Sequence, residues 1–343
     1  MVTRRRRRGR WALLLLIGLL GAAATLRTMQ RWWDAPLAAL TGPTVLEIAP
    51  GERVGHIAER LARLGVLDYP RTWAWQARAR GLASHIRAGE YELKAAASPG
   101  EVLALLVSGK VLLHPVTLVE GWTVAQALSA VHEQPFLKVS GTLPGGLQPL
   151  AGAHDSLEGL LFPDTYLVPK GTTDLEVLRL AQARLTAQLA AAWAARVPGL
   201  PYQRPYDALI LASIIEKETG NPDERAHIAA VFINRLRRGM RLQTDPTVIY
   251  GMGARYAGTL RKKDLTTDTP WNTYTRVGLP PTPIALPGAA SLAAALHPAD
   301  ADDLFFVATG SGDGRHTFSA TLAAHNAAVA GYVARQRQKV QQR

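Results

Sequence analysis

The chain has 343 residues, 48% of them hydrophobic and 19% charged, which predicts two or three folded units and argues against global disorder. It contains no cysteine, which excludes disulfides, thiol nucleophiles, cysteine-ligated zinc and a lipid-modified cysteine anchor. The formal net charge is +12, but the arginines among residues 4–10 supply six of these charges, so the remainder of the chain is only mildly basic.

An uncharged apolar run follows the arginine block. It covers residues 11–26, and tryptophans stand at its start and shortly after its end, at Trp11, Trp32 and Trp33. Positive charge flanks membrane helices on the cytoplasmic side, and tryptophan gathers at membrane surfaces. The pattern therefore predicts a membrane segment whose N-terminus is cytoplasmic. A full span needs about 20 residues, so we expect the helix to extend over residues 11–29.

The same run also fits a cleaved signal peptide, in which Ala22, Ala23 and Ala24 would form the processing site. The density of leucine and the absence of a clear polar region before that site favour a retained anchor. In both cases the rest of the chain is exported, so we expect the folded body on the extracytoplasmic side.

Short elements alternate after the anchor. The expected order is a strand, two helices, a strand and a third helix, with a closing strand near residues 112–118. This order resembles a LysM module, a fold often used to bind N-acetylated glycans, although a plain spacer domain is an equal alternative. The expected elements are a strand at residues 44–49, helices near residues 57–64 and 70–80, a strand at residues 90–93 and a helix that begins at the capping sequence Ser98-Pro99-Gly100-Glu101.

A larger region of different character begins at Glu120. We expect a helix that opens at residues 121–124, a Gly/Pro-rich stretch at residues 140–152, a compact segment at residues 162–166 and a long alanine-rich helix at residues 174–196. Later segments predict a further helix, capped by Asn221 with Pro222 at its first position, and a strand at residues 304–307. The region reads as a mixed α+β domain.

The segment at residues 207–219 is apolar until it meets two glutamates, Glu216 and Glu218. At helical spacing Glu218 continues the stripe of Leu211, Ile214 and Ile215, whereas Glu216 continues a mixed stripe. A carboxyl group among apolar neighbours has a raised pKa and can stay protonated near neutral pH, as a general acid requires. The alternative is a pair of solvated glutamates at a helix end, which is the more common arrangement for such spacing.

Polar residues after this segment are candidates for a substrate groove. Gln243, Thr244 and Asp245 offer donors and acceptors suited to sugar hydroxyls and acetamides, although Thr244-Asp245-Pro246 also has the form of a helix cap. Asn272 and Tyr274 lie on a proline-rich segment, residues 271–288, which should be a semi-rigid loop. His316 follows a glycine-rich turn, and such a histidine more often has a structural role.

Other chemistries find little support. The sequence has no phosphate-binding loop, no Gly-x-Ser-x-Gly elbow and no His-Glu-x-x-His motif. Its nine histidines are scattered, so we predict no metal and no cofactor. Nucleic-acid binding is the weakest alternative, because the arginines that suggest it precede the membrane segment.

Seven segments, taken together, resemble the endolytic murein (peptidoglycan) transglycosylases, the MltG or YceG-like family. The resemblance covers about residues 44–332 and implies a bacterial inner-membrane protein that cuts peptidoglycan glycan strands internally. In that family the catalytic acid is the second glutamate of Glu-Lys-Glu-Thr, which is Glu218 here. The segments are Leu161-Phe-Pro-Asp-Thr-Tyr166, Ala212-Ser-Ile-Ile-Glu-Lys-Glu-Thr219, Val231-Phe-Ile-Asn-Arg-Leu236, Leu242-Gln-Thr-Asp-Pro-Thr-Val-Ile-Tyr-Gly251, Asn272-Thr-Tyr274, Gly278-Leu-Pro-Pro281 and His316-Thr-Phe318.

The resemblance also implies the reaction. Lytic transglycosylases cleave the MurNAc-GlcNAc bond without water, because the muramoyl 6-hydroxyl attacks C1 and leaves a 1,6-anhydro end. One carboxyl group can act as acid and then as base, so no second acid is required, although folding could bring Glu158 or Asp245 close to Glu218. Leu286 departs from the asparagine expected before Pro287-Gly288, which puts a substrate role for that position in doubt.

These inferences define the expected protein. It is α+β, with a transmembrane helix, a small LysM-like subdomain and a larger catalytic domain, and its body is periplasmic. The expected partners are peptidoglycan glycan strands, the membrane and the peptidoglycan synthases known as penicillin-binding proteins; a noncatalytic wall-binding scaffold is the alternative. The expected ranges are a basic cytoplasmic tail at residues 1–10, the membrane helix at 11–29, a stalk at 30–43, the LysM-like subdomain at 44–119, the catalytic domain at 120–335 and a polar tail at 336–343.

Overall fold

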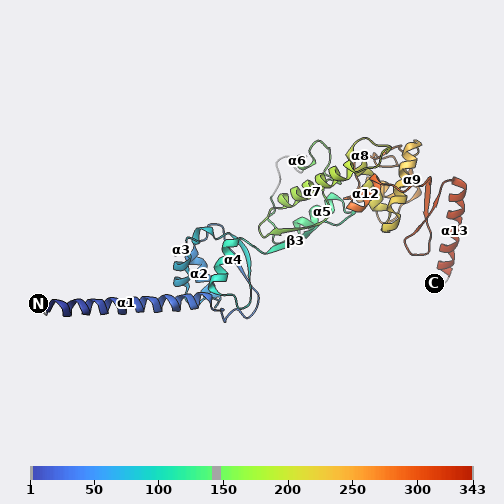
Figure 1. The fold of residues 1–343 in the computed structure, drawn as a ribbon. Coiled ribbons are helices and arrows are strands. Elements are labelled where there is room, and N and C mark those ends of the chain that lie inside the picture. Colours follow the sequence, from blue (N-terminus) through green and yellow to red (C-terminus); the bar gives the residue numbers. More distant parts are fainter. Residues whose placement is uncertain (1–2, 141–147, 342–343) are drawn as a thin grey trace. The chain divides into compact units, whose positions relative to one another are not determined.

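A computed structural model describes residues 3–140 and 148–341 of the chain (Figure 1). Part of the Gly/Pro-rich stretch expected at residues 140–152, and the ends of the two expected tails, lie outside the described residues. The chain divides into two compact units, the first ending at His114 and the second beginning at Pro115. Each unit mixes helices with paired strands, as the sequence predicts for an α+β protein.

The first element is a single long helix, α1, Thr3–Asp34. Its segment Leu13–Asp34 is long and apolar enough to cross a membrane, and none of its most apolar window is buried against the rest of the protein. The helix is longer than predicted at both ends, because it includes most of the expected basic tail and the start of the expected stalk. Arginine is a good helix former, and the first proline after the apolar run is Pro36, so nothing in the sequence stops the helix earlier.

The segment expected to be a free stalk, residues 30–43, packs onto the first unit instead. Trp33, Leu37 and Leu40 are buried in the same core as the helices that follow. The guanidinium of Arg80 lies 4.5 Å from the ring centre of Trp33, which is cation–π geometry. The prediction of a stalk is therefore wrong for these residues, because three large apolar side chains spaced along the segment gain more from burial than from exposure.

The first unit has the predicted order of elements up to its third helix. The strand expected to close it near residues 112–118 continues into the second unit and pairs with a strand there, so that part of the prediction is wrong. Strands β1 and β2 pair antiparallel, with Thr44 opposite Leu93 and Ile48 opposite Gly89. Helix α4 begins with the expected capping box, in which the Ser98 hydroxyl and the Glu101 carboxylate each accept a backbone N–H. The elements are β1 (Thr44–Ile48), α2 (Val54–Arg63), α3 (Pro70–Ala79), the 3-10 turn η1 (Ala83–His85), β2 (Gly89–Leu93) and α4 (Pro99–Ser108).

The second unit confirms several predicted elements and adds others. The predicted strand near 112–118 is β3, the helices at 121–124 and 174–196 are α5 and α7, and the strand at 304–307 is β5. Strand β3 (Leu113–Thr117) pairs with β4 (Thr165–Pro169), and β5 (Phe305–Ala308) pairs with β6 (His316–Ser319). The helices are α5 (Val124–His132), α6 (Gln148–Ala151), α7 (Asp174–Ala194), α8 (Pro205–Glu218), α9 (Arg225–Arg237), α10 (Asp245–Met252), α11 (Lys262–Thr266), α12 (Ala289–Leu296) and α13 (Leu322–Gln341), with 3-10 turns η2 (Pro222–Glu224) and η3 (Gly253–Arg255).

Asn221 caps the short 3-10 turn η2 rather than α9 itself, because its side chain accepts the N–H of Asp223. The sequence did not predict α12, which lies at the end of the proline-rich segment, nor α13 near the C-terminus. Both are rich in alanine, which gives little contrast between an apolar and a polar face.

Helix α8 forms the centre of the second unit. It packs against α7, α9, α10 and α12, and α9 and α12 lie beside it in Figure 1. Every residue from Ala208 to Ile215 is buried, so the helix is apolar on all sides. The predicted distinction between an apolar stripe and a mixed stripe is therefore wrong: both stripes face protein, and the hydroxyl of Ser213 is satisfied internally by the carbonyl of Ile210.

The packing of Trp33 generates a stability prediction for the first unit. A Cβ atom at Gly100 would lie 2.5 Å from Nε1 of Trp33, so Gly100→Ala must displace the indole and should lower the stability of α4 by about 1–3 kcal/mol. Gly55→Ala in α2 is the matched control. Its Cβ would meet only Arg78, at 3.6 Å, so the better helix propensity should raise stability by about 0.5–1 kcal/mol. Hydrogen exchange of the α4 amides in detergent-solubilised protein measures the change in stability for each variant. Equal protection in Gly100→Ala and Gly55→Ala would contradict the packing of Trp33 against Gly100.

Candidate active site

A cavity of about 530 Å³ opens in the second unit where α8 ends. Glu218 stands in its wall, together with Asp245 from the first turn of α10 and Tyr274 from the following loop. The opposite wall comes from β5, from His316 at the start of β6 and from the first turn of α13. The cavity is of the size that holds a small ligand or part of a longer one.

Glu218 is the last residue of α8 and is only partly exposed. The hydroxyl of Thr244 donates a hydrogen bond to its Oε1. Thr244 also occupies the N-cap position of α10, but its side chain makes no capping bond there. Its hydroxyl is therefore used by Glu218, and Pro246 in the first turn of α10 reduces the number of N–H groups that need a cap.

Burial, with a smaller contribution from the nearby charge of Asp245, raises the pKa of the Glu218 carboxyl to about 7. The hydrogen bond from Thr244 and the neighbouring His316 act in the opposite direction without cancelling the effect of burial. About half of the Glu218 side chains therefore carry a proton at neutral pH. Such a carboxyl group can donate a proton to a bound molecule and can take one back.

Asp245 and Tyr274 form a second polar pair in the cavity wall. The Tyr274 hydroxyl donates to Oδ1 of Asp245 at 2.6 Å, and this contact and burial raise the pKa of Tyr274. Two carboxyl groups thus share one cavity, as the sequence allowed for Asp245. Glu158, the other acid considered, lies elsewhere: it accepts bonds from the Val124 N–H at 3.0 Å and the Tyr250 hydroxyl at 3.1 Å, and it does not line the cavity.

The residues before α10 are held in an unusual backbone conformation. Gln243 has a φ of 53°, which a residue with a side chain adopts only where its surroundings impose it. Its backbone N–H donates to the carbonyl of Thr273 at 3.2 Å, and the N–H of Thr244 donates to the Thr273 hydroxyl at 3.1 Å. Arg235 fixes the side chain by donating to its Oε1 at 3.2 Å. This frame places Gln243 in the cavity wall and aims Thr244 at Glu218.

The predicted groove residues divide into two groups. Gln243, Asp245, Tyr274 and His316 line the cavity with Glu218, whereas Thr244 and Asn272 do not. Asn272 is fully buried; its amide nitrogen donates to the carbonyls of Asp264, Leu265 and Thr267, and its oxygen accepts the N–H of Tyr274. The geometry therefore gives Asn272 a role in fixing the loop that carries Tyr274, instead of direct contact with a ligand in the cavity.

His316 is held from outside the cavity. Its Nδ1 lies 2.8 Å from Oε2 of Glu224, and its backbone N–H donates to Oε1 of the same carboxylate at 2.9 Å. Glu224 therefore fixes the orientation of the imidazole, and the ring still reaches the wall of the cavity. This arrangement joins η2, just after α8, to the start of β6.

Glu216 makes structural contacts and does not line the cavity. Its carboxylate accepts the N–H of Gly288 at 2.9 Å, at the N-terminus of α12, and lies 3.7 Å from the guanidinium of Arg225. Neither glutamate side chain is freely solvated, so the alternative of two solvated glutamates at a helix end is wrong. Leu286, the departure from the expected asparagine, is fully buried, and its backbone pairs with Gly121 and Trp122. That position belongs to the core.

The sequence did not identify the cavity residues that β5 and α13 contribute. Phe305, Phe306 and Val307 were predicted only as a strand, and the three residues of α13 were not singled out at all. Arg235 was quoted within a motif but given no role. It is buried and donates to the carbonyls of Leu304 and Leu242, at 2.6 and 2.9 Å, which ties β5 to the segment before α10. The residues missed from α13 are Leu322, His325 and Asn326.

Within the described ranges, no cluster of three or more histidine, cysteine, aspartate or glutamate side chains is arranged to hold a metal ion. The polar groups of the cavity are hydroxyl, amide, imidazole, carboxyl and guanidinium groups. The guanidinium, that of Arg235, donates to backbone carbonyls, and the other groups suit hydrogen bonding to a polar ligand such as a sugar.

Comparison with known proteins identifies the family. The chain belongs to the YceG-like family, whose model matches residues 46–331. It is 32% identical over 314 residues to the endolytic murein transglycosylase of Bacillus subtilis, with 86% of each chain covered. It is 27% identical over 297 residues to the endolytic murein transglycosylase of Streptococcus pneumoniae, covering 76% of this chain and 53% of that protein.

A solved structure has a related fold. The crystal structure of a YceG-like protein from Listeria monocytogenes matches with a TM-score of 0.53 and 29% sequence identity, and the match covers 84% of this chain and 99% of that one. Relationship in sequence and similarity in structure thus extend over most of the chain, and the residues that match the family model include those that line the cavity.

The raised pKa of Glu218 generates a prediction about stability. The folded unit keeps the Glu218 proton up to about pH 7, whereas the unfolded chain releases it near pH 4.5, so ionisation removes stability as pH rises between these values. Glu218→Gln cannot ionise and keeps an oxygen to accept the Thr244 bond. The variant should therefore exceed the wild type by on the order of 3 kcal/mol at about pH 8 and match it at about pH 4. Urea unfolding at the two pH values measures this, and a pH-independent difference would contradict it.

Proposed function

We propose that this chain is a peptidoglycan lytic transglycosylase that cuts glycan strands internally at the MurNAc-GlcNAc bond. The observation that carries the proposal is the buried carboxyl group of Glu218, protonated near neutral pH, in the wall of a ligand-sized cavity. The names of the Bacillus and Streptococcus relatives supply the reaction class and the substrate.

Glu218 acts first as the acid. Its proton passes to the glycosidic oxygen while the bond from that oxygen to C1 of MurNAc breaks, which leaves positive charge on the sugar ring. Asp245 provides negative charge on the same cavity wall to stabilise that ring, and Tyr274 holds its carboxylate. Gln243 and His316 are proposed to bind sugar hydroxyl or acetamide groups, since both reach the cavity.

Glu218 acts next as the base. The 6-hydroxyl of the same MurNAc attacks C1, a new C1–O6 bond forms, and the Glu218 carboxylate takes the hydroxyl proton. No water enters, the enzyme returns to its starting protonation state, and the product carries a 1,6-anhydro end. A pKa near 7 suits both steps, because the group must give up and recover one proton at the same pH.

The first test is the product formed by the protein and its variants. Glu218→Gln should reduce strand cleavage by about 10³-fold or more, because the cavity then lacks the carboxyl group proposed to give and recover the proton. Asp223→Asn is the matched control, since it removes a carboxylate from the exposed η2 turn close to Glu218 and should retain activity. Mass spectrometry of digests of purified glycan strands detects anhydro ends.

Each alternative leaves a distinct product pattern in this experiment. A noncatalytic wall-binding scaffold gives strand binding without new chain ends from any version. A water-using hydrolase gives reducing ends instead of anhydro ends. Equal cleavage by Glu218→Gln and wild type would remove Glu218 from its proposed role.

The first unit is proposed to be a LysM-like module that binds glycan. Its β1-α2-α3-β2 order, with β1 and β2 antiparallel, supports this assignment. A cavity of about 460 Å³ lies between the turn after β1 and the segment after α3, and it offers backbone edges and the side chains of Glu52, Arg78 and Ser84. A second contact with the strand would hold it while the second unit cuts.

The membrane anchor is proposed to restrict cleavage to new strands. We place the N-terminus in the cytoplasm, α1 across the inner membrane and both units in the periplasm, near the synthases that extend the strands. Packing of Trp33 and Leu37 into the first unit leaves no free stalk between the anchor and the fold. Covalent connection then keeps Glu218 within a few tens of ångströms (~50 Å) of the bilayer whatever the relative orientation of the units.

A version released from the membrane tests this restriction. Replacing residues 1–29 with a cleavable signal peptide should free the enzyme to cut mature wall and should abolish its control of the length of newly made strands. The measurement is the strand-length distribution in cells that depend on this version, with a version carrying an unrelated transmembrane helix as the control. Normal lengths from the released version would contradict the role of the anchor.

A further inference from the structure

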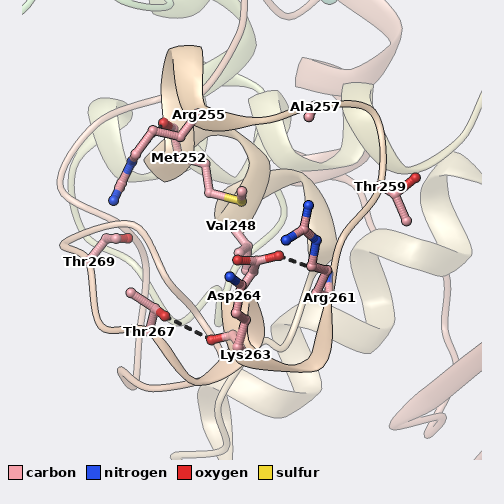
Figure 2. A pocket seen from close by; sticks show the side chains of 10 residues that line it. All are labelled: Val248, Met252, Arg255, Ala257, Thr259, Arg261, Lys263, Asp264, Thr267 and Thr269. Carbon is pink, nitrogen blue, oxygen red and sulfur yellow. Dashed lines mark hydrogen bonds between the residues drawn. The ribbon is translucent and has the colours of Figure 1, made fainter.

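A second cavity, of about 320 Å³, lies further along α10 than the first (Figure 2). Val248 and Met252 from α10 form its floor, and Arg255 follows in η3. The segment that returns to α11 and the residues just after α11 close the ring, as the sticks in Figure 2 show. None of the groups assigned to catalysis lines this cavity.

The side chains around the second cavity are strongly biased toward positive charge. Arg255, Arg261 and Lys263 face one carboxylate, Asp264. Asp264 accepts the backbone N–H of Arg261 at 2.8 Å and so caps α11. In the described part of the chain, none of the three cations forms an ion pair. By contrast, Arg276, which lies just outside, pairs with Asp268 at 2.8 Å.

A hydrogen-bonding group in the wall is also unused. The Oγ1 atom of Thr269 is buried and has no hydrogen-bond partner among the described residues, and Figure 2 shows this hydroxyl directed toward the centre of the ring. Its neighbour Thr267 is satisfied, because its hydroxyl donates to the carbonyl of Lys263 at 2.8 Å. A buried hydroxyl without a partner is uncommon in proteins. This oxygen is enclosed next to Gly251 of α10, so a rotation of the Thr269 side chain would present it to a ligand in the cavity.

Two structural links join this cavity to the one that holds Glu218. Helix α10 contributes Asp245 to the first cavity and Val248 and Met252 to the second, so at 1.5 Å per residue the two lie about 5–10 Å apart along the helix. Asn272 fixes both walls, because its amide nitrogen holds the carbonyls of Asp264 and Thr267 while its oxygen holds the N–H of Tyr274. The two cavities therefore keep a constant spacing.

We propose that the second cavity binds a carboxylate of the peptide stem that MurNAc carries, so that the enzyme prefers glycan strands that bear peptides. This inference rests on the proposed function. The glycan backbone itself offers hydroxyl and acetamide groups without net charge, whereas the stem peptides supply carboxylates. A stem on a sugar close to the cut bond lies at the distance that separates the two cavities. Arginine and lysine with an unpaired hydroxyl form a suitable receptor for this group.

A paired comparison of substrates tests the proposal. Two substrates are offered to the full-length protein in detergent, and kcat/KM is measured for each. One is strands that carry stem peptides. The other is strands stripped of them by an amidase and then converted to the methylamide at the lactoyl carboxyl group that the amidase exposes, so that the stripped strands carry no carboxylate. The variant Arg261→Gln/Lys263→Gln should lose about tenfold on peptide-bearing strands and keep its rate on stripped strands. Lys262→Gln is the control for the loss of one positive charge from α11 at a position outside the cavity lining, and Lys263→Gln alone is the single variant matched to it. Added salt should reduce the wild-type preference for peptide-bearing strands.

The other outcomes overturn the proposal. Equal wild-type rates on both substrates, or an equal loss of rate by the variant on both, would show that the second cavity does not bind the stem peptide. A loss confined to strands that still carry a lipid pyrophosphate would assign the cavity to phosphate instead. If wild type cuts neither substrate, the proposed function fails separately. In that case the affinity of Glu218→Gln protein for both kinds of strand is measured, with and without Arg261→Gln/Lys263→Gln. Weaker binding of peptide-bearing strands alone would still support the proposed role of the second cavity, and unchanged binding would contradict it.

Discussion

Burial of α8 on every side is the constraint on which the second unit depends. Apolar burial stabilises a helix in proportion to the area removed from water, and here residues 208–215 are all enclosed by neighbouring helices. A helix held so firmly fixes the position of its last residue, and that residue is Glu218. The energetic cost of keeping a carboxyl group at the edge of this core appears as a raised pKa, which is the property an acid and base at neutral pH requires.

The polar groups that surround Glu218 are placed by backbone contacts that lie one layer further out. Thr273 receives the N–H groups of Gln243 and Thr244, Arg235 connects β5 to the same segment, and Glu224 orients His316. Each of these residues uses its polar atoms on the protein, so the groups that face the cavity are held in place before any ligand binds. Such preorganisation is what makes polar side chains effective in catalysis.

The two units make different contributions. In the first, the packing of Trp33 makes the end of the long apolar helix α1 part of the folded core, so no free segment separates this helix from the unit. In the second, α10 lines two cavities, one that holds the carboxyl groups of Glu218 and Asp245 and one in which basic side chains outnumber acidic ones, and Asn272 holds the loop that borders both. A substrate that combines an uncharged glycan with anionic peptides would match this distribution of charge.

The sequence by itself determined the elements whose signals are local. The apolar run after the arginines, the capping boxes at Ser98, Thr123 and Thr173, and the apolar segment that ends at Glu218 all depend on residues within one or two turns. The tertiary structure alone decided which polar residues meet. Asn272 and Tyr274 are close in sequence, yet Asn272 is buried in the loop and Tyr274 lines the cavity. Helix α13 contributes residues to the cavity wall, and no sequence motif predicted them. The physical reason is that burial and hydrogen-bond partners are set by segments far apart in the chain, such as Thr244 with Glu218 and His316 with Glu224, and no local pattern records those distances.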